Sequence, residues 1–266
     1  MFRSIFLKFF LFLFSLLFLS SCGDLSSEND EQKVIKLALA GNVTYAIPEL
    51  KKAFNLKYPD IKVDVILGSS GKLTAQIKNH APFDVFMSAN MKYPTQLKKD
   101  GFAITEPIIY AQGGLALITI KDLPISGNLN FLETTNINKI AIANPKTAPY
   151  GKASIEAFKN SKIYEQINSK LVFAETITQA VQYALTASDV GLIAKSSLYD
   201  KKLSQYKENK NWISVDRDLY TPINQGIVIL KNAEKTGNLE TAKLFYDFIL
   251  SNEAKKIFES YGYIIN

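Results

Sequence analysis

Short runs of β-branched and other apolar residues alternate with amphipathic stretches along most of this chain, and this alternation limits the possible folds more than any other feature. The runs with the length and composition of strands are 34–40, 61–67, 84–88, 115–120, 139–143, 190–194 and 226–230. The stretches with helical periodicity and capping residues are 44–54, 72–79, 93–99, 152–158, 178–185, 241–250 and 253–260. The alternation of strands with helices along the chain predicts an α/β fold built on mainly parallel sheets.

The composition excludes several classes of function. Beyond Arg3 and Lys8 the chain has 29 basic and 25 acidic residues, an excess too small and too dispersed to predict nucleic-acid binding. A single cysteine, Cys22, excludes an intramolecular disulfide and a thiolate metal cluster. With one histidine, His80, a zinc site is not expected, and we interpret His80 as a solvated residue at a helix end. Because Arg217 is the only arginine after Arg3, an anion site would have to consist of amides and hydroxyls.

The N-terminal segment predicts export. Basic residues precede the apolar run 9–19, which has the length of a signal-peptide core and is too short to span a membrane as a helix. The sequence LSSC, which ends at Cys22, resembles the lipobox of bacterial lipoproteins, in which the cysteine is acylated and becomes the first mature residue. We therefore expect a lipoprotein signal peptide over 1–21 and a flexible polar tether over 22–33. An uncleaved anchor and an ordinary signal peptide with an incidental cysteine are the alternatives.

Turns that join a strand to a helix are the candidates for a ligand site, because open α/β sheets bind ligands beyond the carboxyl ends of their strands. The four turns are GNVT (41–44), GSSG (68–71), NPKTAPYG (144–151) and ETIT (175–178). The second lacks the spacing of a nucleotide-binding P-loop. Each turn can present free backbone N–H groups and about half a positive charge from the helix dipole. Any one turn alone is an ordinary helix cap, whereas four turns around one cleft would form an anion cage without a formal charge.

At these turns the chain resembles the molybdate-binding proteins (ModA family) of bacterial ABC importers, over nearly all of the sequence after the tether. The resemblance is carried by LALAGNVTYAIPEL, GSSGKLTAQIKNHAPFDVFMSAN, ANPKTAPYGKASIEAF, AETITQAVQYALTASDVGLIA and LFYDFILSNEAKKIFESYGYII, of which the second is the most specific. It implies a two-lobed periplasmic binding protein fold of type II, with a hinge of two crossing segments. Lobe 1 would comprise 34–112 and 226–266, and lobe 2 would comprise 113–225.

The resemblance also implies a ligand and the residues that bind it. The ligand would be molybdate or tungstate, bound by Asn42, Ser70, Tyr150 and Ile177. Asn42 stands where many relatives have serine, and Ser70 would donate its hydroxyl and its amide. Tyr150 and Ile177 would donate backbone N–H groups. These ions are unprotonated dianions at neutral pH, so their cage needs donors only, whereas hydrogen phosphate also needs an acceptor for its own proton.

One position departs from the family pattern. Some relatives have a tyrosine where this chain has Ala194, so one hydroxyl donor is missing. We expect Asn42 to replace it, because its side-chain amide carries two N–H donors where serine has one hydroxyl. Lys195 is the alternative, although strand alternation would turn it away from the face of Ala194.

From these features we expect a monomeric binding protein rather than an enzyme, which delivers its oxyanion to the permease subunits of an ABC transporter. Localisation would be extracytoplasmic, with a lipid anchor in a bacterial membrane through Cys22. We expect no cofactor, no nucleic acid and no protein-ligated metal ion, since the metal belongs to the oxyanion. Sulfate or phosphate is the alternative ligand. The alternative classes are an exported enzyme, for which no nucleophile–base–orienter set is recognisable, and a structural or adhesive surface lipoprotein.

Overall fold

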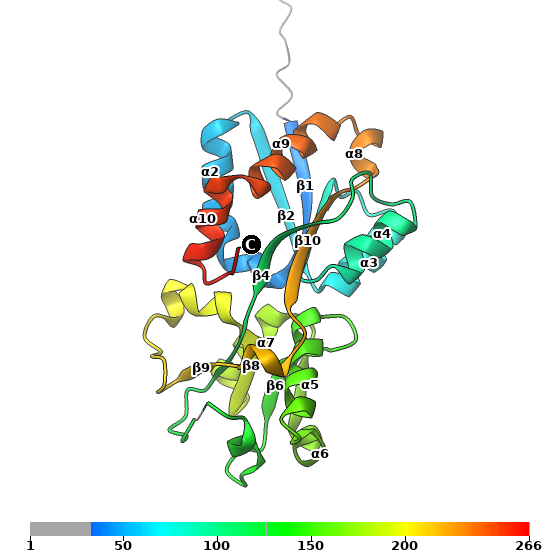
Figure 1. Cartoon of the computed structure of the whole chain (residues 1–266). Helices are drawn as coiled ribbons and strands as arrows, with labels where there is room; N and C mark the ends of the chain where they lie inside the picture. Colours follow the sequence, from blue (N-terminus) through cyan, green and yellow to red (C-terminus); the bar gives the residue numbers. More distant parts are fainter. Residues whose placement is uncertain (1–32, 126, 266) are drawn as a thin grey trace, which may run out of the picture. The chain divides into compact units, whose positions relative to one another are not determined.

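The computed structural model describes residues 33–125 and 127–265 (Figure 1). The predicted signal peptide, Cys22 and the tether up to residue 32 lie outside the described residues. By its internal contacts the segment from residue 32 to the end forms a compact unit of its own. None of the helices in the described part is both long enough and apolar enough to cross a membrane.

The strands form two sheets of five strands each. In the first sheet the order is β2 (Ile61–Gly68), β1 (Lys33–Ala40), β3 (Val85–Ser88), β10 (Ile223–Ile229) and β4 (Ile108–Gly113). In the second it is β7 (Leu171–Ala174), β6 (Ile140–Ala143), β8 (Val190–Ala194), β5 (Leu115–Ile118) and β9 (Trp212–Ser214). All seven predicted strands are present, and the α/β fold with two lobes is confirmed.

The sheets are mixed, and this refines the prediction of mainly parallel sheets. In each sheet two strand pairings are parallel and two are antiparallel. The reason lies in the passage between the lobes: β4 carries the chain from the first sheet toward β5 in the second, and β10 brings it back (Figure 1). Two neighbouring strands that carry the chain in opposite directions must pair antiparallel, as β4 and β10 do.

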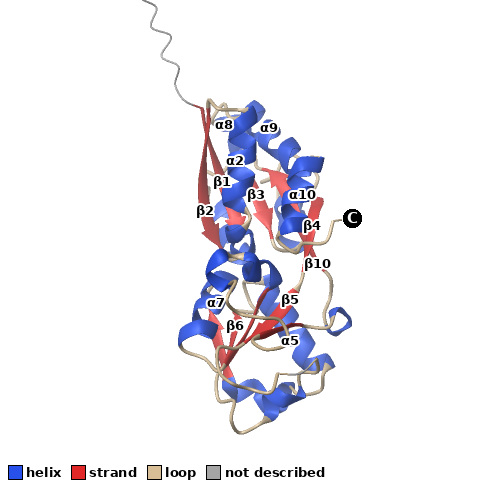
Figure 2. Cartoon of the chain, turned by 90° about the vertical axis from the view of Figure 1, so that its left-hand side faces the viewer, coloured by secondary structure: helices blue, strands red, loops and turns tan. Residues whose placement is uncertain are grey.

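Helices flank both sheets (Figure 2). Those of lobe 1 are α2 (Ile47–Lys57), α3 (Ser70–Lys78), α4 (Lys92–Lys99), α8 (Asn232–Lys235), α9 (Leu239–Leu250) and α10 (Asn252–Ser260). Those of lobe 2 are α5 (Pro149–Asn160), α6 (Tyr164–Ile167) and α7 (Ile177–Thr186). Short 3₁₀ helices are η1 (Gly41–Tyr45), η2 (Asn130–Glu133), η3 (Asn168–Lys170), η4 (Lys195–Tyr199), η5 (Lys201–Leu203) and η6 (Arg217–Leu219).

Alternation along β1 explains why helices cover both faces of the first sheet. Leu37 and Leu39 point into a core that α2, α9 and α10 complete, whereas Ala38 between them belongs to the core under α3 and α4. A strand that is apolar on both faces needs such cover on each side. The arrangement leaves the ends of the strands, where the four turns lie, as the place for a ligand.

Candidate functional site

Strand register brings the four turns together in pairs. In the first sheet the last residues of β1 and β2, Ala40 and Gly68, are partners, so η1 and α3 begin beside each other. In the second sheet Ala143 and Ala174, the last residues of β6 and β7, are partners. The turn before α5 therefore lies next to the turn before α7.

Hydrogen bonds then join the two pairs of turns across the lobes. Thr178 Oγ1 in α7 donates to the carbonyl oxygen of Gly41 in η1 (2.9 Å). The Gly71 N–H in α3 donates to the carbonyl oxygen of Thr147, before α5 (2.8 Å). All four turns predicted from the sequence thus meet at one place between the lobes.

The helices that follow these turns present free N–H groups. No side chain caps the N-terminus of η1, α3 or α5, and in α7 the cap residue Thr176 accepts only from the N–H of Gln179 (3.1 Å). The first N–H groups of a helix have no acceptor within the helix, and the helix dipole favours an anion there. Pro149 has no N–H, so Tyr150 supplies the first one in α5, and Ile177 supplies the first one in α7.

Ser70 is placed to donate a hydroxyl hydrogen. Its side chain is buried, and its Oγ accepts a hydrogen bond from the N–H of Ala89 (3.0 Å). A hydroxyl that accepts from the protein still has its own O–H to donate. The bond from Ala89 therefore fixes the position of Ser70 Oγ without using the donor that an anion needs.

Asn42 is held differently from what its predicted role requires. It is fully buried, and its Nδ2 donates to Gln225 Oε1 (2.8 Å) and to the Tyr263 hydroxyl (3.2 Å). Its Oδ1 is buried as well and has no hydrogen-bond partner among the described residues. In this orientation both amide hydrogens are used within the protein, and the unused atom is an acceptor.

Unpartnered polar atoms gather at the site. Four buried side-chain oxygen atoms lack a hydrogen bond within the described part of the chain, and three of them belong to Asn42, Ser69 and Thr147 in these turns. Leaving a buried polar group unpaired costs roughly 1–3 kcal/mol, so such a cluster indicates a missing partner. Ser69 and Thr147 were not predicted from the sequence, although their hydroxyls within the turns GSSG and NPKTAPYG were an available signal.

Three buried tyrosines adjoin Asn42 and Gln225. Burial raises the pKa of Tyr110 and of Tyr150 well above the usual range, and it raises the pKa of Tyr263 to about 12. Their hydroxyls therefore stay protonated at neutral pH. The interior of the site is built from neutral groups.

Formal charges lie at the rim. Lys72 Nζ in α3 pairs with Glu175 Oε1 before α7 at 2.6 Å, and both side chains are about half exposed. Lys72 thus lies at the rim, and its ion pair across the lobes was not predicted from the sequence. Beside this pair a pocket of about 340 Å³ opens between the lobes, with Gly41 and Gly68 on one side and Thr178 on the other.

Near the position of the missing tyrosine, the Ser196 hydroxyl is buried and donates to the carbonyl oxygen of Asn42 (3.1 Å). Ala194 is buried at the end of β8. The N–H of Lys195 donates to the carbonyl oxygen of Gly114 (2.8 Å), and a Cβ on Gly114 would lie 3.7 Å from that of Lys195. Lys195 therefore adjoins the crossing between the lobes.

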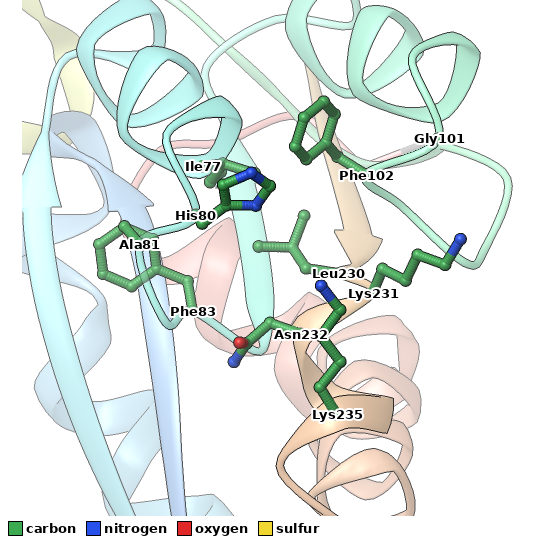
Figure 3. Close-up of a pocket in the computed structure, with 10 residues that line it drawn as sticks. All are labelled: Ile77, His80, Ala81, Phe83, Gly101, Phe102, Leu230, Lys231, Asn232 and Lys235. Carbon is green, nitrogen blue, oxygen red and sulfur yellow. The ribbon is translucent and has the colours of Figure 1, made fainter.

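A second pocket, of about 260 Å³, lies within lobe 1 beyond the end of α3 (Figure 3). Apolar residues such as Phe83 and Leu230 line it together with Lys231 and Lys235. None of the four turns contributes to it, so it is not the candidate site. His80, which also lines it, is exposed and follows α3 with φ 61°, in agreement with the predicted helix-end position.

No group of three or more His, Cys, Asp or Glu residues in the described ranges is arranged to hold a metal ion. The four turns present backbone N–H groups and the hydroxyls of Ser69, Ser70 and Thr147. These are the donors that suit an anion.

Comparison with known proteins agrees with this geometry. A family model described as bacterial extracellular solute-binding protein matches residues 35–264. The chain belongs to this family. The molybdate-binding protein ModA of Rhodobacter capsulatus is 34% identical over 229 residues, which cover 85% of this chain and 86% of that protein. ModA of Azotobacter vinelandii is 32% identical over 232 residues, 86% of this chain and 89% of the relative.

A solved structure extends the comparison to the fold. The periplasmic molybdate-binding protein of Azotobacter vinelandii superposes with a TM-score of 0.78 at 29% identity, covering 87% of this chain and 99% of that chain. The resemblance to the ModA type seen in the sequence and the two-lobed type II fold are thereby confirmed. As a member of a family of extracellular solute-binding proteins, this protein is not an enzyme and functions outside the cytoplasm.

Proposed function

We propose that this solute-binding protein captures molybdate or tungstate at the four turns and delivers it to the permease of an ABC transporter. One lobe would close on the other around the anion, and the closed form would be the state that the permease recognises. The ligand-binding residues are those implied by the sequence, namely Asn42, Ser70, Tyr150 and Ile177. Ser69 and Thr147 are added to them.

The main support is the set of donors without a partner. Buried hydroxyls at Ser69, Ser70 and Thr147 meet the uncapped starts of α3 and α5, and no basic side chain is among them. Such a cage suits an ion that accepts hydrogen bonds on every oxygen. Each hydrogen bond to a charged group contributes roughly 1.5–3 kcal/mol. About six of them contribute roughly 9–18 kcal/mol in gross terms. Nanomolar binding requires ~12 kcal/mol after the desolvation of the dianion has been offset, so the upper part of this range is needed.

A specific observation favours phosphate as the second candidate. Asn42 Oδ1 is a buried acceptor without a partner, and an acceptor is what the proton of hydrogen phosphate requires. Sulfate carries no proton at neutral pH and gains nothing from this atom. Phosphate is therefore the competitor against which molybdate has to be compared.

Thermal unfolding with and without anion tests the proposal. A ligand present at 1,000 times its Kd stabilises the folded state by about 4.1 kcal/mol. For a domain of this size that corresponds to a rise in Tm of roughly 10 °C. We expect this rise with molybdate or tungstate and no chemical change in the anion. Absence of any shift with all four anions, molybdate, tungstate, sulfate and phosphate, would contradict the proposal.

Replacing Ser70 should weaken binding far more than replacing its charged neighbour. Ser70→Ala removes a donor to the anion, which costs about 1–3 kcal/mol, or roughly 5–150-fold in Kd. Lys72→Ala removes a half-exposed ion pair with Glu175 and a screened attraction, so Kd should change less than about 3-fold. Calorimetric titration of both variants with molybdate measures this. A larger loss in Lys72→Ala would mean that the cage depends on a formal charge.

The membrane anchor is also part of the proposal and rests on the sequence LSSC. In cells that acylate lipoproteins, the unsubstituted chain should incorporate labelled fatty acid, and Cys22→Ala should not. Extraction of the membrane fraction with salt should then release the variant while the unsubstituted protein stays bound. Equal labelling of the two proteins would rule out acylation at Cys22.

A further inference from the structure

The side chain of Gln225 links site turns from the two lobes. Gln225 belongs to β10 and is fully buried. Its Oε1 accepts from Asn42 Nδ2 in η1 (2.8 Å) and from the Tyr110 hydroxyl (2.7 Å). Its Nε2 donates to the hydroxyl of Tyr150 in α5 (3.2 Å). One amide on a crossing strand thus contacts a predicted ligand residue in each lobe.

These hydrogen bonds determine what Asn42 presents to a ligand. Its Nδ2 faces Gln225 and Tyr263, so its Oδ1 faces the opposite way, where it is enclosed and meets no donor. An oxygen in that place would repel an unprotonated dianion. It would accept a hydrogen bond from the P–O–H group of hydrogen phosphate.

A half-turn of both amides reverses this at the cost of one hydrogen bond. The Tyr263 hydroxyl, which donates to the carbonyl oxygen of Asn42 (2.8 Å), would donate to Asn42 Oδ1 instead, and that carbonyl oxygen would keep its bond from Ser196 Oγ (3.1 Å). The last torsion of Asn and Gln side chains has nearly two-fold symmetry, so oxygen and nitrogen can exchange places. Gln225 Nε2 would then donate to Asn42 Oδ1 and to the Tyr110 hydroxyl, and the Tyr150 hydroxyl would donate to Gln225 Oε1. Asn42 Nδ2 would take the place of the unpartnered oxygen and present its N–H groups.

The two amides have to turn together. If Asn42 turned alone, its Oδ1 would face Gln225 Oε1 at the distance of the present hydrogen bond, 2.8 Å. Two acceptors at that distance repel each other. The orientation of Gln225 therefore decides whether Asn42 offers a donor or an acceptor.

We propose that Gln225 is a positioning residue for oxyanion selection, which turns together with Asn42 so that Asn42 donates to an unprotonated dianion. This inference rests on the proposed function. It explains how a site with a buried unpartnered acceptor accommodates molybdate. It also explains how Asn42 replaces the donor missing at Ala194.

A double-mutant cycle tests whether Gln225 acts through Asn42. In the unit 32–266, Gln225→Met removes both polar atoms and keeps the size of the side chain. We expect it to weaken molybdate binding about 10-fold in calorimetry. In the Asn42→Ser background the same change should weaken binding less than 2-fold. Gln112→Met is the matched control, because Gln112 bonds Asn224 and Arg217 in the same crossing region without contacting Asn42; its Kd should stay within 2-fold.

The outcomes distinguish the inference about Gln225 from the proposed function on which it rests. Equal losses from Gln225→Met in the two backgrounds would mean that Gln225 acts only through the fold, and would overturn the inference while leaving the proposed function in place. Failure of the unsubstituted protein to bind any of the anions would overturn both. Thermal unfolding of each variant shows whether it is folded before the titration is interpreted.

A measurement on the unsubstituted protein covers the case in which Gln225→Met does not fold. The side-chain amide signals of Asn42, Gln225 and Gln112 can be followed by ¹⁵N NMR as molybdate is added, with Asn42→Ser and Gln112→Met identifying two of the three. We expect the Asn42 and Gln225 signals to shift together at saturation, and the Gln112 signal to stay in place. A shift of Asn42 with Gln225 unchanged would overturn the coupled turn.

Discussion

Replacing Gly151 by alanine should abolish tight binding and destabilise lobe 2. Gly151 lies in the first turn of α5, and a Cβ atom there would stand 2.6 Å from the carbonyl carbon of Ala143 at the end of β6 and closer still to its oxygen. The end of β6 and the start of α5 can separate only if the start of α5 moves. Such overpacking costs about 3 kcal/mol. The N–H of Tyr150 moves with the helix. Kd for molybdate should therefore rise on the order of 100-fold, since the charge-assisted bond from this N–H, which contributes roughly 1.5–3 kcal/mol, is misplaced.

Gly127→Ala is the matched control for this change. Gly127 belongs to the same lobe, and a Cβ at its position would meet no atom within 4 Å. In urea unfolding and in calorimetric titration with molybdate, Gly127→Ala should keep the unfolding midpoint and the Kd of the unsubstituted protein. If Gly151→Ala behaved like Gly127→Ala in both measurements, the close approach of α5 to β6 would not position the site.

Replacing Asp84 by alanine should cause a large loss of stability. The carboxylate is buried at the start of β3 and accepts from the N–H of Lys36 (2.9 Å) and from side chains of Asn232 (3.2 Å), Thr236 (3.3 Å) and Asn238 (3.2 Å). Its removal leaves these donors without their acceptor in lobe 1. Because each unpaired buried group costs roughly 1–3 kcal/mol, we expect a loss of about 3 kcal/mol in the free energy of unfolding.

Urea unfolding measures this prediction, with Asp64→Ala as the control. Asp64 lies in β2 and pairs with Lys62 at 3.2 Å, but its side chain is 39% exposed. Exposed pairs contribute roughly 0–1 kcal/mol, so this variant should remain close to the unsubstituted protein. Similar losses in the two variants would show that the buried hydrogen bonds of Asp84 do not stabilise lobe 1.

Most of the fold could be predicted because the arrangement of apolar residues that identifies each central strand or helix lies within that element's own sequence. The predicted strand 190–194 corresponds to β8, a continuous buried apolar run, and the predicted helix 178–185 corresponds to α7, whose buried residues have helical spacing. The strands that were missed, β4, β7 and β9, each pair with only one neighbouring strand, at an edge of their sheet. These edge strands are apolar but partly exposed, as Ile108 and Ile109 in β4 and Phe173 in β7 show, so an apolar run alone did not distinguish them from neighbouring loops.

The candidate site could be predicted in its backbone parts and not in its side-chain orientations. The family resemblance implied the N–H groups of Tyr150 and Ile177, and both residues lie in the first turn of their helices, α5 and α7. That these N–H groups bind the anion stays a prediction. The orientation of Asn42 depends on Gln225, 183 residues away, and on Tyr263, 221 residues away. No local pattern records such contacts, and the ion pair of Lys72 with Glu175 joins two lobes for the same reason.

Calorimetric titration of the unit 32–266 with molybdate, tungstate, sulfate and phosphate tests the central claim most directly. The neutral cage of donors predicts one site per chain, with molybdate and tungstate bound at least 100-fold more tightly than phosphate, a difference of about 2.7 kcal/mol. Tight binding of phosphate, with molybdate weaker, would contradict the account and would mean that Asn42 Oδ1 keeps the orientation described here.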